Sequence, residues 1–132
     1  MVAARPGNSA PLEVAEAVAR ILAEVRVLEA MRTGPDFPVW YDALPIAGVD
    51  GSLSGRMKGT AAERNVHAKT GTLDKARSLS GYVTTADGHV LLFSFLCNNF
   101  TVPAREVERV QDAILVFLAS PAPRTAQPSG SR

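Results

Sequence analysis

The chain has 132 residues, of which 46% are hydrophobic and 20% are charged, and its formal net charge is +1. These values predict one soluble globular domain and exclude the strongly basic surface typical of nucleic-acid binding. No apolar run approaches the ~18 residues of a membrane span, and the first ten residues lack the apolar stretch of a signal peptide. With a single cysteine, Cys97, and two histidines, the sequence predicts no disulfide, metal site or cofactor.

The first half of the chain predicts one helix followed by a long irregular segment. Residues 1–10 predict a flexible arm. Apolar residues then recur every three or four positions, so we expect a helix over residues 11–31 that buries Val14, Val18, Ile21, Leu22, Val25 and Leu28. Residues 34–60 contain three prolines and five glycines, which predicts a loop anchored by Phe37, Trp40 and Tyr41.

The second half predicts three strands, over residues 65–72, 78–85 and 89–97, with an Asp-Gly hairpin turn between the last two. The third strand is apolar on both faces, so we expect a covering layer on each side of the sheet. Pro103 opens a second helix, with Val107, Val110, Ile114 and Phe117 predicted to be buried and Arg105, Glu108 and Asp112 predicted to face outward.

This order of elements predicts an α+β fold, with three antiparallel strands flanked by an N-terminal and a C-terminal helix. Residues 11–119 form the predicted domain, and residues 120–132 a disordered tail. Three strands and two helices make a thin core for a sheet buried on both faces. We therefore expect the chain to be part of a larger unit.

The most informative motif is His67-Ala-Lys-Thr-Gly-Thr72, on the first predicted strand. A Lys-Thr-Gly tripeptide on a strand is one signature of penicillin-recognising enzymes with an active-site serine. The Lys69 ammonium can bind a peptide carboxylate, and Gly71 lets a substrate backbone lie close to the strand. On a regular strand, Lys69 and Thr72 point to opposite faces, so a shared ligand requires a twist or bulge. The alternative is an edge strand on which a solvated lysine prevents aggregation.

Other candidate residues favour structural roles. His67 and His89 are expected on the strand surface, and Cys97 in the core. Asp50, Asp74 and Asp87 are expected in turns. A phosphate-binding loop is excluded because no glycine cradle precedes Lys69-Thr70.

Four runs in the correct order resemble the C-terminal end of D-alanyl-D-alanine carboxypeptidases and endopeptidases of the penicillin-binding protein 4 (class C) type. The resemblance covers roughly residues 28–118. The runs are Leu44-Pro-Ile-Ala-Gly-Val-Asp-Gly-Ser-Leu53, His67-Ala-Lys-Thr-Gly-Thr-Leu73, Ser80-Gly-Tyr-Val-Thr-Thr-Ala-Asp-Gly88 and Phe93-Ser-Phe-Leu-Cys-Asn-Asn99.

The resemblance implies part of a transpeptidase/β-lactamase-like sandwich, in which a five-stranded antiparallel sheet has helices on both faces. The strands of this chain are then the last three, and the first two strands and the helical subdomain are missing. The implied partners are a peptidoglycan stem peptide or penicillin and an absent N-terminal half. Relatives are exported to the periplasm or cell envelope.

The resemblance also implies roles for four residues. Lys69 binds the terminal D-alanine carboxylate and supports acylation, and Thr70 and Gly71 line the strand along which the peptide lies. Thr72 offers its backbone N–H to the oxyanion and its hydroxyl to the carboxylate.

Two family elements are absent from the sequence. None of the nine serines has a lysine three residues later, and no Ser-x-Asn occurs. Acyl transfer needs the nucleophile within reach of its activating base, so the chain alone is expected to be inactive. The alternative is a non-catalytic module that binds a peptide or a subunit through the strand edge.

Overall fold

A computed structural model describes residues 10–123 of the chain. Its elements are α1 (Ala10–Thr33), α2 (Phe37–Ala43), a short 3-10 helix η1 (Gly51–Leu53), β1 (His67–Leu73), β2 (Ala76–Thr84), β3 (Val90–Asn98) and α3 (Ala104–Ala119). The predicted arm before residue 10 and the predicted tail beyond residue 123 lie outside the described residues.

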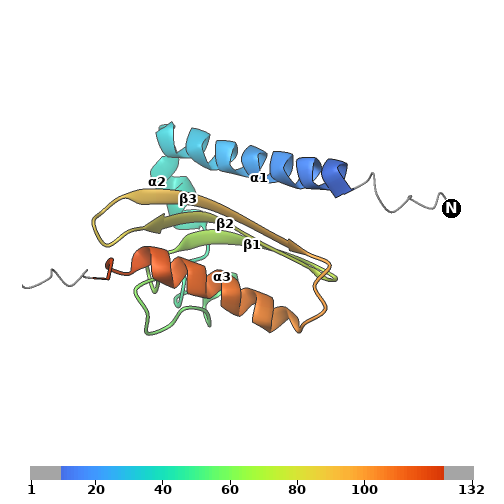
Figure 1. Cartoon of the computed structure of the whole chain (residues 1–132). Helices are drawn as coiled ribbons and strands as arrows, with labels where there is room; N and C mark the ends of the chain where they lie inside the picture. Colours follow the sequence, from blue (N-terminus) through green and yellow to red (C-terminus); the bar gives the residue numbers. More distant parts are fainter. Residues whose placement is uncertain (1–9, 124–132) are drawn as a thin grey trace, which may run out of the picture.

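The three strands form one antiparallel sheet in the order β1-β2-β3. Helix α1 covers one face of this sheet and α3 covers the other (Figure 1). This arrangement confirms the predicted α+β fold and the two covering layers. Within the described chain, β1 and β3 are the edges of the sheet.

The main core lies on the α3 side of the sheet. Leu79 and Val83 of β2 pack there with Leu115 of α3 and with Leu53 and Val66 from the segment before β1, and all five are fully buried. Strands β1 and β2 approach each other closely at Gly81 of β2, where an added Cβ would overlap the carbonyl of His67. Only glycine fits at that position of the ladder.

A second, aromatic cluster lies on the opposite side of the sheet. Tyr82 of β2 is fully buried there, beneath Leu28 of α1 and Phe37 of α2. The rings of Phe37 and Tyr82 meet edge to face, with their centroids 5.3 Å apart. This cluster fixes α1 and α2 against the strand next to β1.

The predicted irregular segment 34–60 contains a helix that the sequence analysis missed. Helix α2 spans Phe37–Ala43 and has Pro38 in its first turn, where the missing N–H costs no hydrogen bond. Its three aromatic side chains are half-buried, and they pack against Tyr82 and its neighbours. Tertiary packing stabilises a seven-residue helix that would be marginal alone.

The predicted buried stripe of α3 is wrong except at Val107, which is half-buried. Its buried residues are Gln111, Leu115 and Ala119, whereas Val110, Ile114 and Phe117 are exposed. The side chains of Glu108 and Asp112, predicted to face outward, instead bind Arg77 of β2 and Arg56 of the loop before β1. Both ion pairs favour the observed orientation of the helix.

The stripe predicted for α1 is correct only in part. Leu28 is buried, and Ile21 and Val25 are half-buried, but Val14, Val18 and Leu22 are exposed. No helix of the described part is long and apolar enough to cross a membrane.

Candidate functional site

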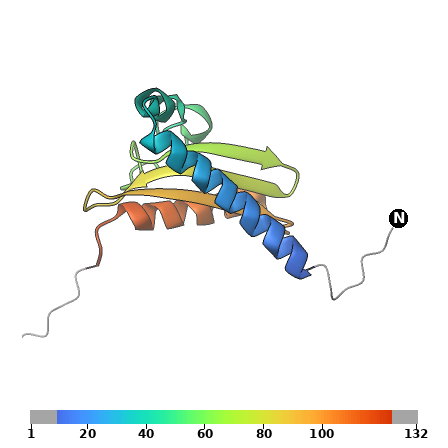
Figure 2. The ribbon, with the colours of Figure 1, turned by 90° about the horizontal axis from the view of Figure 1, so that it is seen from above.

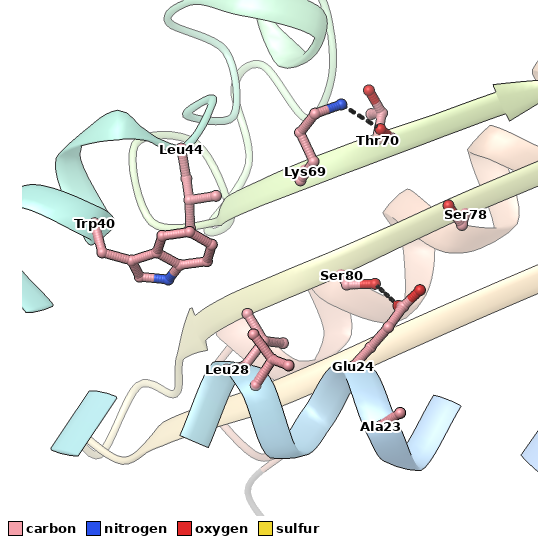
Figure 3. Close-up of a pocket in the computed structure, with 10 residues that line it drawn as sticks. Ala23, Glu24, Leu28, Trp40, Leu44, Lys69, Thr70, Ser78 and Ser80 are labelled. Carbon is pink, nitrogen blue, oxygen red and sulfur yellow. Dashed lines mark hydrogen bonds between the residues drawn. The ribbon is translucent and has the colours of Figure 1, made fainter. Parts of the chain in front are cut away.

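A hollow of about 350 Å³ lies between α1, α2 and the β1 side of the sheet (Figure 3). We call it the edge hollow. Lys69 and Thr70 of the predicted motif line it, together with hydroxyl groups of β2 and apolar groups of the helices. Its lining residues are Ala23, Glu24, Val27, Leu28, Trp40, Leu44, Lys69, Thr70, Ser78 and Ser80.

Lys69 stands on the exposed edge strand. Its side chain extends on the side of β1 away from β2 (Figure 3), and its ammonium donates a hydrogen bond to the carbonyl of Thr70 at 2.6 Å. No carboxylate lies within ion-pair distance of Lys69 in the described chain. The charge is therefore available to an anionic ligand at the strand edge.

Thr70, Gly71 and Thr72 follow along the same strand. The ladder to β2 is regular through all three residues, without a bulge, so Thr70 and Thr72 face away from the side of Lys69. The Thr70 hydroxyl donates to Ser52 Oγ at 2.9 Å, which joins β1 to η1. Gly71 leaves room for the Ser78 hydroxyl, which an added Cβ would overlap. No side chain therefore rises from the strand at this position beside Lys69.

A carboxylate missed by the sequence analysis lies at the inner end of the edge hollow. Glu24 of α1 accepts hydrogen bonds from Ser80 of β2 and from Ser94 of β3, the latter at 2.7 Å. Ser80 is the cross-strand partner of both Lys69 and Ser94. No sequence pattern links Glu24 to these hydroxyls, because the chain distance is 56 residues or more.

The wall beside the edge hollow is aromatic. The Tyr82 hydroxyl donates to the Leu28 carbonyl at 2.6 Å and accepts from Trp40 Nε1 at 3.2 Å. Burial raises the pKa of Tyr82, although the hydrogen bond from Trp40 and the nearby Arg32 oppose that rise. Burial also raises the pKa of Tyr41, and Asp42 adds to this effect.

His67 is not the surface residue that the sequence analysis predicted. It is 6% exposed, its ring stacks on Tyr41 with centroids 3.7 Å apart, and its Nδ1 lies 3.0 Å from the Tyr41 carbonyl. The flanking helix α2 supplies both contacts. His67 thus fixes the start of β1 and takes no part in the edge hollow.

The chemistry available at this site is recognition of an anionic group beside an extended backbone. The lining holds one cation, Lys69, at the strand edge, the hydroxyl groups of Ser78 and Ser80, and one carboxylate, Glu24, at the inner end. The described residues contain no group of three or more His, Cys, Asp or Glu side chains that could hold a metal ion.

Comparison with known proteins identifies the class to which this α+β fold belongs. The model of the D-Ala-D-Ala carboxypeptidase 3 (S13) family matches residues 13–120, which is most of the chain. The chain belongs to this family.

Similar proteins are known from several organisms. A D-alanyl-D-alanine carboxypeptidase of Actinomadura sp. (strain R39) is 43% identical over 113 residues, which is 82% of this chain and 20% of that protein. The D-alanyl-D-alanine carboxypeptidase DacB of Haemophilus influenzae is 36% identical over 93 residues, covering 69% of this chain and 19% of that protein.

A solved structure shows the same partial match. Penicillin binding protein 4 from Haemophilus influenzae, in complex with a novel β-lactam, superposes with a TM-score of 0.59 at 33% identity. The match covers 63% of this chain and 19% of that protein. The chain therefore spans about a fifth of the length of these relatives.

Proposed function

We propose that the chain is the C-terminal portion of a serine-type D-Ala-D-Ala carboxypeptidase that acts on peptidoglycan stem peptides through an acyl-enzyme. The observation that carries this proposal is the Lys69-Thr-Gly motif on the exposed strand β1, at the rim of the edge hollow. Its ammonium has no carboxylate partner in the described chain and is free to bind the carboxylate of a terminal D-alanine.

The other motif residues complete the proposed substrate edge. Thr70 and Gly71 line the rim along which the peptide lies, and Thr72 offers its backbone N–H to the oxyanion. The absence of a bulge argues against simultaneous contact of the Lys69 and Thr72 side chains with one carboxylate. We therefore assign carboxylate binding to Lys69 and oxyanion binding to the Thr72 backbone.

The same proposal predicts that the chain has no catalytic activity in isolation. A serine nucleophile needs a base within hydrogen-bond reach, and no Ser-x-x-Lys or Ser-x-Asn is present in the 132 residues.

Labelling with a fluorescent penicillin tests whether the isolated chain is inactive. We expect the purified chain to form no covalent adduct that survives denaturation, while penicillin binding protein 4 from Haemophilus influenzae is labelled in the same tube. A stable adduct on the isolated chain would contradict the proposal, since it would reveal a nucleophile among the nine serines.

A chimera tests the active role of the motif. Residues 13–120 of this chain replace the matching segment of the Haemophilus influenzae protein, and labelling is expected to persist. In the chimera, Lys69→Ala should slow acylation by about 100-fold or more, the usual loss when one transition-state contact is removed. Lys58→Ala, at an exposed lysine outside the edge hollow, is the matched control and should leave labelling unchanged. Equal rates for the two variants would overturn the role of Lys69.

A further inference from the structure

Three hydrogen-bond donors gather around Thr70 at the outer edge of β1. The Ala68 N–H points away from β2, because it donates to the Pro45 carbonyl at 2.9 Å. The backbone groups of an antiparallel strand alternate in direction, so the N–H and the carbonyl of Thr70 also point outward. Among the described residues, no acceptor is bound to the Thr70 N–H. This N–H is the first donor.

The Lys69 ammonium is the second donor. The Lys69 side chain begins on the α1 face of the sheet, yet its ammonium reaches the outward carbonyl of Thr70 at 2.6 Å (Figure 3). An ammonium has three N–H bonds, so two remain for a ligand. The charge therefore lies at the strand edge, in line with the outward backbone groups of Thr70.

The third donor is a hydroxyl that the sequence analysis did not single out. Ser52 of η1 is exposed, and its Oγ accepts the hydrogen bond from the Thr70 hydroxyl at 2.9 Å. A serine hydroxyl both accepts and donates, and in the described part of the chain the proton of Ser52 has no acceptor. Donation by Thr70 also polarises the Ser52 hydroxyl and strengthens it as a donor. Ser52 can therefore donate to an anionic ligand at this edge.

The loop that carries Ser52 lies along the outer side of β1, at the start of the strand (Figure 2). Hydrogen bonds within the loop fix its shape. The Ile46 N–H donates to Asp50 Oδ1 at 2.7 Å, and the Gly48 N–H donates to the Leu53 carbonyl at 2.9 Å. Leu53, which follows Ser52, is fully buried in the main core. The position of Ser52 is therefore set by the loop itself.

We propose that Ser52 binds the substrate carboxylate together with Lys69. The inference rests on the proposed function, in which the Lys69 ammonium binds the carboxylate of a terminal D-alanine. A carboxylate has about four acceptor positions on its two oxygens, so one ammonium leaves most of them unfilled. The regular ladder places the Thr72 side chain on the face opposite to that of Lys69. Ser52 reaches the edge from the supporting loop instead, and the Thr70 N–H completes the set of donors.

Binding of N-acetyl-D-alanyl-D-alanine to the full chain, followed by the shifts of amide signals in NMR spectra, tests this role. Ser52→Ala should weaken binding of the peptide by about tenfold, as expected when a hydrogen bond to a charged group is lost. Ser52→Thr keeps a hydroxyl at this position and should restore binding to within about threefold of the parent. Ser54→Ala is the matched control and should leave binding unchanged, because Ser54 is exposed at the end of η1, outside the edge hollow.

Thr70→Val distinguishes direct binding by Ser52 from simple support of β1. This variant removes the hydrogen bond between the two hydroxyls but leaves Ser52 in its loop, so it should weaken binding less than Ser52→Ala does. An equal or larger loss in Thr70→Val would overturn the proposal, since Ser52 would then act only through Thr70. We expect the urea midpoints of these variants to match that of the parent, so that weaker binding does not reflect loss of fold.

Lys69→Ala in the same titration separates this inference from the proposed function. A loss of binding with Lys69→Ala but none with Ser52→Ala would overturn the role of Ser52 and leave the proposed function intact. A loss with neither variant would contradict both. Absence of binding by the parent chain at about 10 mM peptide, where a site with a Kd of about 1 mM is mostly filled, would also overturn the inference. Labelling of the chimera would still test the proposed function in that case.

Discussion

The two edge strands of the sheet, β1 and β3, differ in the segments that support them and in the charge that they carry. Before β1, the segment leading into the strand forms an isolated bridge from Ile46 to His67, and the Ala68 N–H donates to the Pro45 carbonyl at 2.9 Å. The exposed remainder of β1 carries Lys69 and Thr72. Among the described residues, no further segment covers the outer edge of β3, and the strand carries no charge.

This difference separates a polar edge, which carries the proposed substrate residues, from an apolar edge. A polar edge with one lysine resists pairing with other strands and can hold an anionic ligand, whereas an uncharged apolar edge offers its unpaired backbone groups to another strand. The edges also differ in support, since the loop packed behind β1 joins it to α3. Variants that disturb this support or the neighbouring strand turns test the comparison.

The largest effect is expected at the support of β1. Leu53 of η1 is fully buried in the main core beside β1, and Leu53→Ala should lower the free energy of unfolding by about 2–5 kcal/mol, as transfer and cavity effects add. Urea denaturation measures this loss. Leu73→Ala is the matched control, because Leu73 is 74% exposed at the end of β1 and its loss should change stability by less than about 0.5 kcal/mol. Equal losses would show that η1 does not support β1.

The next effect concerns the arginine that connects the loop to α3. Arg56 donates to Asp112 at 2.6 Å, and also to the Gln111 side chain and the Glu108 carbonyl, both at 3.3 Å. Arg56→Ala should destabilise the fold by about 1–3 kcal/mol, because these acceptors lose a shared donor in a half-buried site. Thermal unfolding measures the change.

Arg109→Ala provides the comparison for Arg56. Arg109 is exposed on α3, so Arg109→Ala should change the free energy of unfolding by less than about 0.5 kcal/mol. If Arg56→Ala is equally mild, the rotation of α3 has another cause, and packing of Leu115 alone orients the helix.

These two sites show what could be predicted from the sequence. The strands and both long helices follow from local periodicity and turn residues, which act over a few positions. The orientation of α3 does not, because it depends on Arg56, more than 50 residues away in a loop. Glu24 and Trp40 were missed as parts of the edge hollow for the same reason. Lys69 was found because its neighbours Thr70 and Gly71 form a recognisable motif.

Tyr82 provides a smaller, pH-dependent effect behind β1. Its pKa is raised by burial from the ordinary 10.0, so the folded chain holds this proton more tightly than the unfolded chain. Stability is therefore unaffected below about pH 10 and falls as the pH rises above that value. Tyr82→Phe should cost about 1 kcal/mol at neutral pH through the lost hydrogen bonds, and should make the alkaline fall shallower.

Tyr41→Phe separates the two contributions of Tyr82. The pKa of Tyr41 is also raised, mainly by burial, but its hydroxyl makes no hydrogen bond among the described residues. This variant should therefore make the alkaline fall shallower with little loss at neutral pH. Denaturant unfolding at several pH values, with phenolate absorbance as a second measurement, compares the variants. A neutral-pH loss as large as that of Tyr82→Phe would contradict the hydrogen-bond assignment.

The smallest change in stability is expected at the two turns that lead out of β1 and into β3. Both use a residue with positive φ, which is Lys75 at 49° in the β1–β2 turn and Gly88 at 90° in the β2–β3 turn. A lysine is strained there because its Cβ crowds the backbone, whereas glycine is not. Lys75→Gly should therefore stabilise the fold by about 0.5–1 kcal/mol, and Gly88→Ala should destabilise it by a similar amount. Urea midpoints measured side by side test this pair, and a loss of stability in Lys75→Gly would show that the lysine side chain contributes more than its backbone strain costs.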